Sequence, residues 1–381
     1  MIDTVALVLQ RDQFRITNPD MFSPNCTDIY KYDSGMFAYK SYVKCFQNMT
    51  KNDIKTNNYK PRLTVYRRGG RVELKIEFSA PKLIFGNNFE ELVDRDLDRV
   101  IEILLSKLKE MGITTNTQCL RESKVSTVHF GKNIVLGSGV SSSMILSELS
   151  QCDLYSRLDV SQSDYRNEGH ILKWHANSYE LAFYDKVKDL QQAQVSEKRA
   201  LESDNYVQLN ILDRIEDLNR KSVLRMELRL NVPVKIKSAL KSIGENPYRL
   251  SFEQVFSSRL ARKVLLDYWS KLTPQLQIVQ ITSANLSEAF VLLKLWNPTF
   301  KVEKLLKLFS GLILVKDGGM RSLRGKLGYC REQSAKWYRY LADLKSLKLP
   351  QANSYRSTFV IGQQIDAFIA LKMSDLSLKS T

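Results

Sequence analysis

The chain has 381 residues, enough for two domains, and its 43% hydrophobic and 10% aromatic content excludes an intrinsically disordered protein. Lysine and arginine number 57 against 41 aspartate and glutamate, a net charge of +16 that suits a polyanionic partner such as DNA, although a basic enzyme without such a partner remains an alternative. No apolar run reaches the length of about 18 residues that a membrane helix needs, and no secretory signal pattern opens the chain. We therefore expect a cytoplasmic protein that does not bind a membrane.

The five cysteines give no sign of a metal site or a disulfide framework. None belongs to a C-x-x-C pair, so a zinc site built on cysteine is not expected. An odd, scattered set is typical of reduced thiols in a cytoplasmic protein.

Strands and turns are predicted over the first eighty residues. Residues 4–9 form an apolar run typical of a buried strand, whereas 11–60 are expected to form loops and short strands. A strand over 63–66 precedes a turn at 69–70, and residues 71–79 alternate in polarity. The apolar face of that last strand carries Val72, Leu74, Ile76 and Phe78, and its polar face carries Glu73, Lys75 and Glu77.

Two helices and a strand are predicted next. Apolar residues recur at helical spacing over 89–111, and Gly112 is expected to follow the end of that helix. Residues 124–134 are predicted to form a strand. A second helix is predicted over 138–151, with Ser142 or Ser143 as its N-terminal cap.

The middle of the chain predicts a hairpin and a further strand. Residues 171–176 and 179–183 are expected to pair across a turn near Asn177-Ser178. Residues 186–216 are charged and rich in glutamine, as in a surface helix or helical insertion. Residues 222–231 alternate: Val223, Met226, Leu228 and Leu230 lie mainly on one face, and Arg225, Glu227 and Arg229 lie on the other.

Helical patterns dominate from residue 251 onward, which places a domain boundary near 240–250. We predict an α+β fold: an antiparallel sheet with helices on one side forms a catalytic domain over 1–245, followed by a helical DNA-binding domain over 246–381. Near its end, two helices flank a turn at Gly328, a pattern typical of helix-turn-helix DNA readers, with phosphate contacts expected from Arg331, Lys336 and Arg339. An ordinary solvated helix pair is the alternative.

The segment 169–186 concentrates residues suited to phosphodiester chemistry. It holds two of the three histidines, His170 and His175, and ends in Tyr184-Asp185-Lys186. A tyrosine nucleophile needs a nearby cation to lower its pKa and charge stabilisation on the phosphate. Tyr184 is therefore the candidate nucleophile, and Lys186 could supply the charge stabilisation on the phosphate, although a tyrosine at a strand end is more often a structural aromatic.

Histidines with nearby carboxylates predict a Mg²⁺ or Mn²⁺ site that polarises the phosphate. Residues five apart lie on opposite faces of a regular strand, so only one of His170 and His175 is expected to bind the ion. The other candidates are His129 with Glu77 or Glu227. The alternatives are core histidines and strand glutamates paired with Lys75, Arg225 or Arg229.

Several segments resemble the gene II/X family of rolling-circle replication initiators from filamentous phages and plasmids. The segments are MIDTVALVL (1–9), SAPKLIFGNN (79–88), VHFGKNIVL (128–136), 157–186 and LRMELRLN (224–231). They spread over roughly the first 230 residues, and the chain lacks the His-hydrophobe-His triplet of related nicking enzymes. The resemblance implies that Tyr184 is the nucleophile, with Tyr179 as the alternative, and that His129 and Glu227 belong to the metal site.

The resemblance further implies a nicking–joining enzyme. A tyrosine would cut one strand of a supercoiled or single-stranded origin, remain linked to the 5′ phosphate, and later rejoin the displaced strand, with a host helicase as a further partner. A non-catalytic DNA-binding replication or transcription regulator is the main alternative function. A transposase or conjugative relaxase with the same chemistry is a third.

Overall fold

A computed structural model describes most of the chain. The described residues are 1–30, 42–50, 52–53, 56, 58–68, 71–137, 140–152, 163–166, 170–176, 178–195, 222–248, 250–279, 286–329, 334–348 and 355–377.

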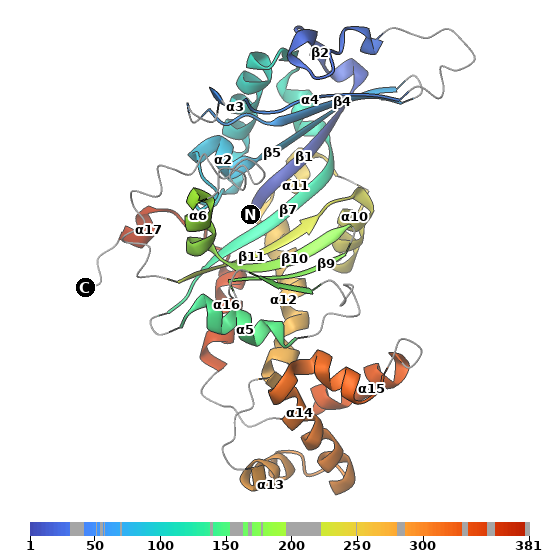
Figure 1. The fold of residues 1–381 in the computed structure, drawn as a ribbon, viewed down its shortest axis with the longest axis vertical. Coiled ribbons are helices and arrows are strands. Elements are labelled where there is room, and N and C mark those ends of the chain that lie inside the picture. The colour runs from blue at the N-terminus through green and yellow to red at the C-terminus, as the bar shows by residue number, and fades with distance from the viewer. Residues whose placement is uncertain are drawn as a thin grey trace.

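These residues form one large antiparallel sheet flanked by helices, an α+β fold (Figure 1). Its nine strands are arranged in the order β3-β4-β5-β1-β7-β11-β10-β9-β8. Their bounds are β1 Ile2–Gln10, β3 Tyr42–Gln47, β4 Arg62–Arg68, β5 Arg71–Ser79, β7 Lys124–Val135, β8 Ser163–Arg166, β9 Ile171–Ala176, β10 Tyr179–Asp185 and β11 Val223–Leu230. A small second sheet pairs β2 (Arg15–Ile16) with β6 (Ile113–Thr114).

The helices follow in two groups along the chain. The first group is α2 Ala80–Phe85, α3 Leu97–Glu110, α4 Thr117–Glu122, α5 Ser142–Ser150, α6 Lys186–Val195, α10 Pro233–Ser242, α11 Phe252–Val255 and α12 Ser258–Val279. The second is α13 Leu286–Trp296, α14 Val302–Lys326, α15 Ser334–Ser346, α16 Tyr355–Ala367 and α17 Ser374–Ser377. Within the described part of the chain, no helix is long and apolar enough to cross a membrane.

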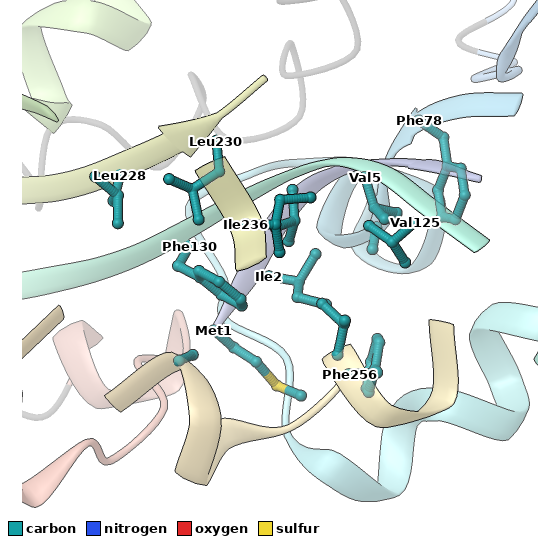
Figure 2. Packing of buried hydrophobic residues seen from close by; sticks show 14 of the residues in the cluster. Met1, Ile2, Val5, Phe78, Val125, Phe130, Leu228, Leu230, Ile236 and Phe256 are labelled. Carbon is teal, nitrogen blue, oxygen red and sulfur yellow. The ribbon is translucent and has the colours of Figure 1, made fainter. Parts of the chain in front are cut away.

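The apolar face of the sheet holds the main core. Strand residues such as Val5, Val125 and Leu228 pack in one continuous hydrophobic cluster with residues of α3, α5, α10, α11, α12 and α16 (Figure 2). Because strand side chains alternate between faces, the helices that cover this face leave the polar side chains on the other. Helices therefore lie mainly on one side, as predicted, but α6 packs over one end of the other face, where Val187 and Leu190 contact Val223 and Phe89.

A second hydrophobic cluster belongs to α13, α14 and α15 and is centred on Trp337, Leu312 and Leu344. Helices α11, α12 and α16 contribute instead to the cluster of the sheet. The hydrophobic packing thus groups only 286–347 as a separate helical unit. The domain boundary at 245/246 stays a prediction.

The polar face of the sheet carries ionisable side chains on four neighbouring strands, β7, β11, β10 and β9. Register pairing places His129 of β7 opposite Arg229 of β11, Arg229 opposite Glu180 of β10, and Glu180 opposite His175 of β9. Residues directly opposite on antiparallel strands share a face. Side chains from distant parts of the sequence therefore meet on this face, and this is where the candidate site lies.

Most elements predicted within the described residues from 63 to 231 are present, with shifts at their ends. The helix predicted over 186–216 is α6 as far as Val195, and 196–216 lie outside the described residues. The predicted hairpin is β9 and β10. The helix predicted from 89 begins only at Leu97, because a short 3-10 turn precedes it. The cap of α5 is Ser141, whose side chain accepts from the Met144 amide, rather than Ser142 or Ser143. Val223 shares the polar face with Arg225, so its predicted placement with Met226 was wrong.

Candidate active site

Tyr184 and Glu227 meet on the polar face at the centre of the candidate site. Tyr184 lies in β10 opposite Arg225 of β11, which places its ring beside the Glu227 side chain two residues further on. The Tyr184 hydroxyl donates a 2.9 Å hydrogen bond to Glu227 Oε2. Tyr184 is only 6% exposed, so the hydroxyl does not lie open to solvent.

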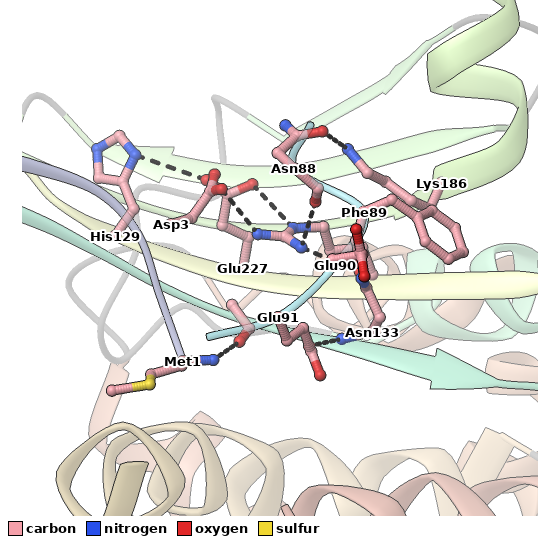
Figure 3. A network of polar contacts seen from close by, with 12 residues as sticks. Met1, Asp3, Asn88, Phe89, Glu90, Glu91, His129, Asn133, Lys186 and Glu227 are labelled. Atoms are coloured by element: carbon pink, nitrogen blue, oxygen red, sulfur yellow. Dashed lines mark hydrogen bonds and ion pairs between the residues drawn. The ribbon is translucent and has the colours of Figure 1, made fainter. Parts of the chain in front are cut away.

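Glu227 is held by a cation and faces an imidazole. Arg229 donates from Nε to Glu227 Oε1 at 3.0 Å and from Nη2 to Oε2 at 3.2 Å. His129 Nδ1 lies 3.5 Å from Glu227 Oε1, and its Nε2 lies 3.2 Å from Asn231 Oδ1. The predicted nucleophile, one predicted carboxylate and one predicted histidine therefore share a single contact network. Figure 3 shows its histidine side, where the His129 ring points toward Glu227.

Arg225 extends this network below Glu227. Its Nη2 lies 3.2 Å from Asp3 Oδ1, and its Nη1 donates to Asn133 Oδ1 at 3.0 Å. The Arg225 Nε is 3.9 Å from Glu227 Oε2, so a second guanidinium faces the same carboxylate. This arginine is buried, and burial among acceptors is the arrangement that a desolvated charge requires.

Lys186 lies near Tyr184 but does not face solvent. It is the first residue of α6 and is 0% exposed. Its ammonium donates to Asn88 Oδ1 at 2.7 Å and lies 5.6 Å from the centroid of the Tyr184 ring. Burial lowers the pKa of Lys186, and Asp189 offsets part of that effect. Lys186 therefore contributes to the field around the tyrosine without reaching the surface.

Burial and neighbouring charges shift the pKa values of Tyr184 and Glu227 in opposite directions. Burial and then the charge of Glu227 raise the pKa of Tyr184 well above its usual value of 10.0. Burial alone would raise the pKa of Glu227, but Arg229, His129 and Arg225 together hold it well below 4.5. The resting pair is a neutral phenol donating to a carboxylate.

The predicted metal ligands are only partly brought together. His129 and Glu227 are in contact, whereas Glu77 forms a 2.7 Å ion pair with Lys75, the alternative that the strand pattern allowed. His175 lies on the same face but three strands from His129, roughly 14 Å away at the usual strand spacing. The described residues contain no group of three or more His, Cys, Asp or Glu side chains arranged to hold a metal ion.

His170 takes a different position from the one expected for a ligand. It precedes β9, and its Nε2 lies 2.6 Å from Lys188 Nζ of α6. Tyr179, the alternative nucleophile, is on β10 with Tyr184 but five residues away, so it points to the opposite face, where Lys235 lies over its ring.

The predicted DNA-contacting residues of α15 are at the surface. Lys336 and Arg339 are exposed, and Trp337 and Tyr340 on the other side of the helix belong to the core of α13, α14 and α15. Arg331 lies outside the described residues.

Sequence reasoning missed much of the network around Glu227. Asp3, Asn88 and Asn133 lie in three of the segments quoted for the resemblance, 1–9, 79–88 and 128–136, but none was singled out as a site residue. Arg229 and Arg225 were noted only as partners that could neutralise a glutamate. Their alternation with Glu227 in β11 was the available signal, since it places three charges on one face.

Comparison with protein-family models, with curated proteins and with solved structures finds no match for this chain.

Proposed function

We propose that the protein is a DNA strand transferase that nicks and rejoins one strand through Tyr184, as an initiator of rolling-circle replication does. The observation that carries the proposal is the hydrogen bond from Tyr184 to Glu227, with His129 on the other oxygen of that carboxylate. A nucleophile beside a base that is itself held by a third group is the usual arrangement of nucleophilic catalysis.

The proposed reaction exchanges one phosphodiester for another. Tyr184 Oη attacks phosphorus and forms a tyrosine–5′-phosphate bond, while the bond from phosphorus to the 3′ oxygen breaks. The phenolic proton passes along the existing hydrogen bond to Glu227, and the departing 3′ oxygen takes a proton from water. Since the number of phosphodiester bonds is unchanged, the 3′ hydroxyl can reverse the step and rejoin the strand.

Arg229 controls this proton transfer in the proposed mechanism. In the resting arrangement the transfer is uphill, because the pKa of Tyr184 is raised and that of Glu227 is lowered. A guanidinium binds a phosphate in the same bidentate way as a carboxylate, so an incoming DNA phosphate would compete with Glu227 for Arg229. Without that cation, Glu227 Oε2 can accept the phenolic proton, while Oε1 stays beside His129.

DNA must also uncover the tyrosine. Tyr184 is 6% exposed, so the phosphate reaches its hydroxyl only after the side chains over it move. Catalytic groups often take up their reactive geometry only in the substrate complex. The net charge of +16 supports a polyanionic substrate, and the exposed Lys336 and Arg339 are proposed to hold duplex DNA next to the origin.

A Mg²⁺ or Mn²⁺ ion would be held by His129 and Glu227. When Nε2 of His129 carries the proton toward Asn231, Nδ1 presents a lone pair toward the carboxylate, an arrangement that suits a cation. Mg²⁺ commonly takes one or two protein ligands and completes its shell with water and substrate phosphate, so a two-residue site fits it. The bound ion would polarise the scissile phosphate.

The decisive experiment pairs Tyr184→Phe with Tyr179→Phe. Both tyrosines are 6% exposed on β10 but face opposite sides of the sheet. With labelled single-stranded oligonucleotides and Mn²⁺, we expect a covalent protein–DNA adduct from the wild type and from Tyr179→Phe and none from Tyr184→Phe. An adduct from Tyr184→Phe would exclude Tyr184 as the nucleophile. EDTA should abolish the adduct and added Mg²⁺ or Mn²⁺ should restore it.

Two observations favour a second function. The burial of Tyr184 and the bidentate pairing of Glu227 with Arg229 also suit a structural network in a non-catalytic DNA-binding regulator. That protein would bind origin DNA and form no adduct under any metal condition, so the same assay separates the two functions.

A further inference from the structure

Strand β3 presents aromatic and basic side chains in alternation on one face. Tyr42 is 62% exposed and Phe46 is 42% exposed, and the exposed Lys44 lies between them. Residues two apart in a strand point to the same side, so the three side chains form a row. Large aromatic rings are uncommon on an open sheet surface, since their burial would otherwise contribute to the core.

This row lies on the same face of the sheet as Tyr184. Tyr42 is opposite Arg68, Lys44 is opposite Tyr66, and Phe46 is opposite Thr64. On the same face, Glu77 of β5 is opposite Ala6 of β1, and Ala6 is opposite Thr127 of β7. Thr127 and His129 are two residues apart in β7 and therefore share this face. Four strand steps separate β3 from β7, roughly 19 Å at the usual spacing. The row and the candidate active site thus lie on the same face of the sheet, the row exposed and Tyr184 buried.

The surroundings of the row are basic. Arg68 and Arg71 are exposed at the end of the β4–β5 hairpin, and Lys75 lies on the same face. The carboxylates there already have partners: Glu77 pairs with Lys75, and Glu73 accepts a 3.1 Å hydrogen bond from Gln10 Nε2.

The backbone of the row is held on both edges. Phe46 pairs with β4 on one side, and on the other it exchanges two backbone hydrogen bonds with Ser23, at 2.9 and 3.0 Å. The Phe46 ring therefore projects from a backbone that is held on both sides, which lowers the entropy cost of binding a flat ligand there.

We propose that Tyr42, Lys44 and Phe46 form a platform for single-stranded DNA, on which unpaired bases stack against the two rings while the basic side chains contact phosphates. Unpaired bases expose their faces and stack on aromatic side chains with little regard to sequence, whereas the bases of a duplex are hidden from such a surface. Basic groups beside the rings supply the charge complementarity that a phosphate backbone requires.

This inference rests on the proposed function only for the identity of the polymer. In that setting, a strand bound across β3, β4 and β5 approaches His129 and Tyr184 along the polar face. Binding at the platform needs no chemistry at Tyr184, so it can be measured separately.

The test is fluorescence anisotropy with a 5′-fluorescein-labelled oligothymidylate and the full chain, with EDTA present to prevent cleavage. We expect the double variant Tyr42→Ala/Phe46→Ala to bind at least roughly tenfold more weakly than wild type. Tyr42→Leu/Phe46→Leu, which keeps the apolar bulk and removes the stacking rings, should lose affinity to a similar extent. Tyr42→Phe should bind like wild type, because only the hydroxyl is removed.

The matched control is Tyr248→Ala, which removes an 81% exposed tyrosine located outside the sheet. It should bind the oligothymidylate like wild type. A labelled duplex should bind the wild type and the double variant with similar affinity. Crosslinking with a bromodeoxyuridine oligonucleotide should attach to the peptide that contains Tyr42–Gln47.

The outcomes separate this inference from the proposed function. Weak binding by both double variants, with normal binding by Tyr248→Ala, supports the platform even when no wild-type adduct forms. Unchanged binding by the double variants overturns the platform even when Tyr184 forms its adduct. The platform is equally overturned by a wild type that does not bind the oligothymidylate, or by crosslinks confined to the C-terminal helices.

Discussion

Arg225 occupies the space directly over Gly131. A Cβ at position 131 would lie 2.6 Å from Arg225 Nη2, closer than such atoms approach in folded proteins. Gly131 is on β7 opposite Glu227, and the missing side chain is what allows the guanidinium to reach Asp3 and Asn133. The glycine is therefore part of the charge network, although it carries no polar side chain.

Gly131→Ala is expected to lower the free energy of unfolding by about 2 kcal/mol, because it displaces a buried guanidinium from its acceptors. Urea denaturation at neutral pH measures the change. Gly137→Ala is the control, since no atom lies within 4 Å of a Cβ at that position, and its effect should be small. Equal stability of both variants would contradict the role given to the space above Gly131.

The acidity of Glu227 predicts how stability depends on pH. Burial raises its pKa, but Arg229, His129 and Arg225 outweigh burial and hold the folded-state pKa well below the usual 4.5. The unfolded state therefore takes up a proton first as the pH falls. The stabilisation from Glu227 is fully present above about pH 4.5 and is lost as the pH falls through the folded-state pKa.

Glu227→Gln should remove that acid dependence. At neutral pH it should lower the free energy of unfolding by about 3 kcal/mol, because Arg229 and Arg225 lose a charged partner. Between about pH 6 and pH 3, its stability should decline less steeply than that of the wild type. Glu253→Gln, at an exposed ion pair with Arg121, controls for the loss of one negative charge. A decline as steep in Glu227→Gln as in the wild type would contradict the assignment.

Gly319 interrupts α14 where that helix contacts α5. It has φ 75°, a conformation that favours glycine, and a Cβ there would lie 2.9 Å from Gln151 Cα. The next residue, Met320, donates its backbone amide to Gln151 O at 2.9 Å. The contact joins the helical unit of α13–α15 to a helix that packs on the sheet.

Gly319→Ala is expected to destabilise the protein by about 1–3 kcal/mol through backbone strain and the close approach to Gln151. Gly325→Ala in the same helix should instead be neutral or stabilise by up to about 1 kcal/mol, because position 325 is open and alanine favours helix. Thermal denaturation of the two variants compares them directly. Opposite signs support the kink as a required contact, and a stabilising Gly319→Ala would refute it.

The sequence predicted the sheet better than the site, for a physical reason. Alternation in 71–79 and 222–231 reports which side chains face the core, and β5 and β11 occupy those stretches. It does not report which strands become neighbours. The contact between Glu227 and His129 depends on β11 pairing with β7, across almost a hundred residues of sequence, and no local pattern contains that pairing.

The sequence also did not reveal which side chains would be buried and which exposed. Lys186 follows an apolar strand and was expected to support charge at an open site, but α6 begins at this residue and encloses its ammonium with Asn88. The aromatic row of β3 was missed because the segment 11–60 contains asparagine and proline among its aromatics, a composition typical of loops. Its alternation spans only 42–47, too short to stand out from that background.

Two exposed cations on helix α15 are expected to contact the phosphates of duplex DNA. Lys336 and Arg339 are exposed, while the neighbouring Trp337 and Tyr340 are fixed in the core, so the two cations project from a rigid surface. If they contact phosphates, Lys336→Gln and Arg339→Gln should each weaken binding of a labelled duplex at low salt. Each should also reduce the slope of log affinity against log salt by about 1.

The matched control is a pair of exposed cations on α3, Lys109→Gln and Arg99→Gln, which lie far from α15 (Figure 1). They change the net charge equally, so any effect of overall charge alone appears in both pairs. We expect the α3 variants to keep the wild-type salt slope. Equal losses in the two pairs would assign duplex binding to the net charge of +16 rather than to a surface on α15.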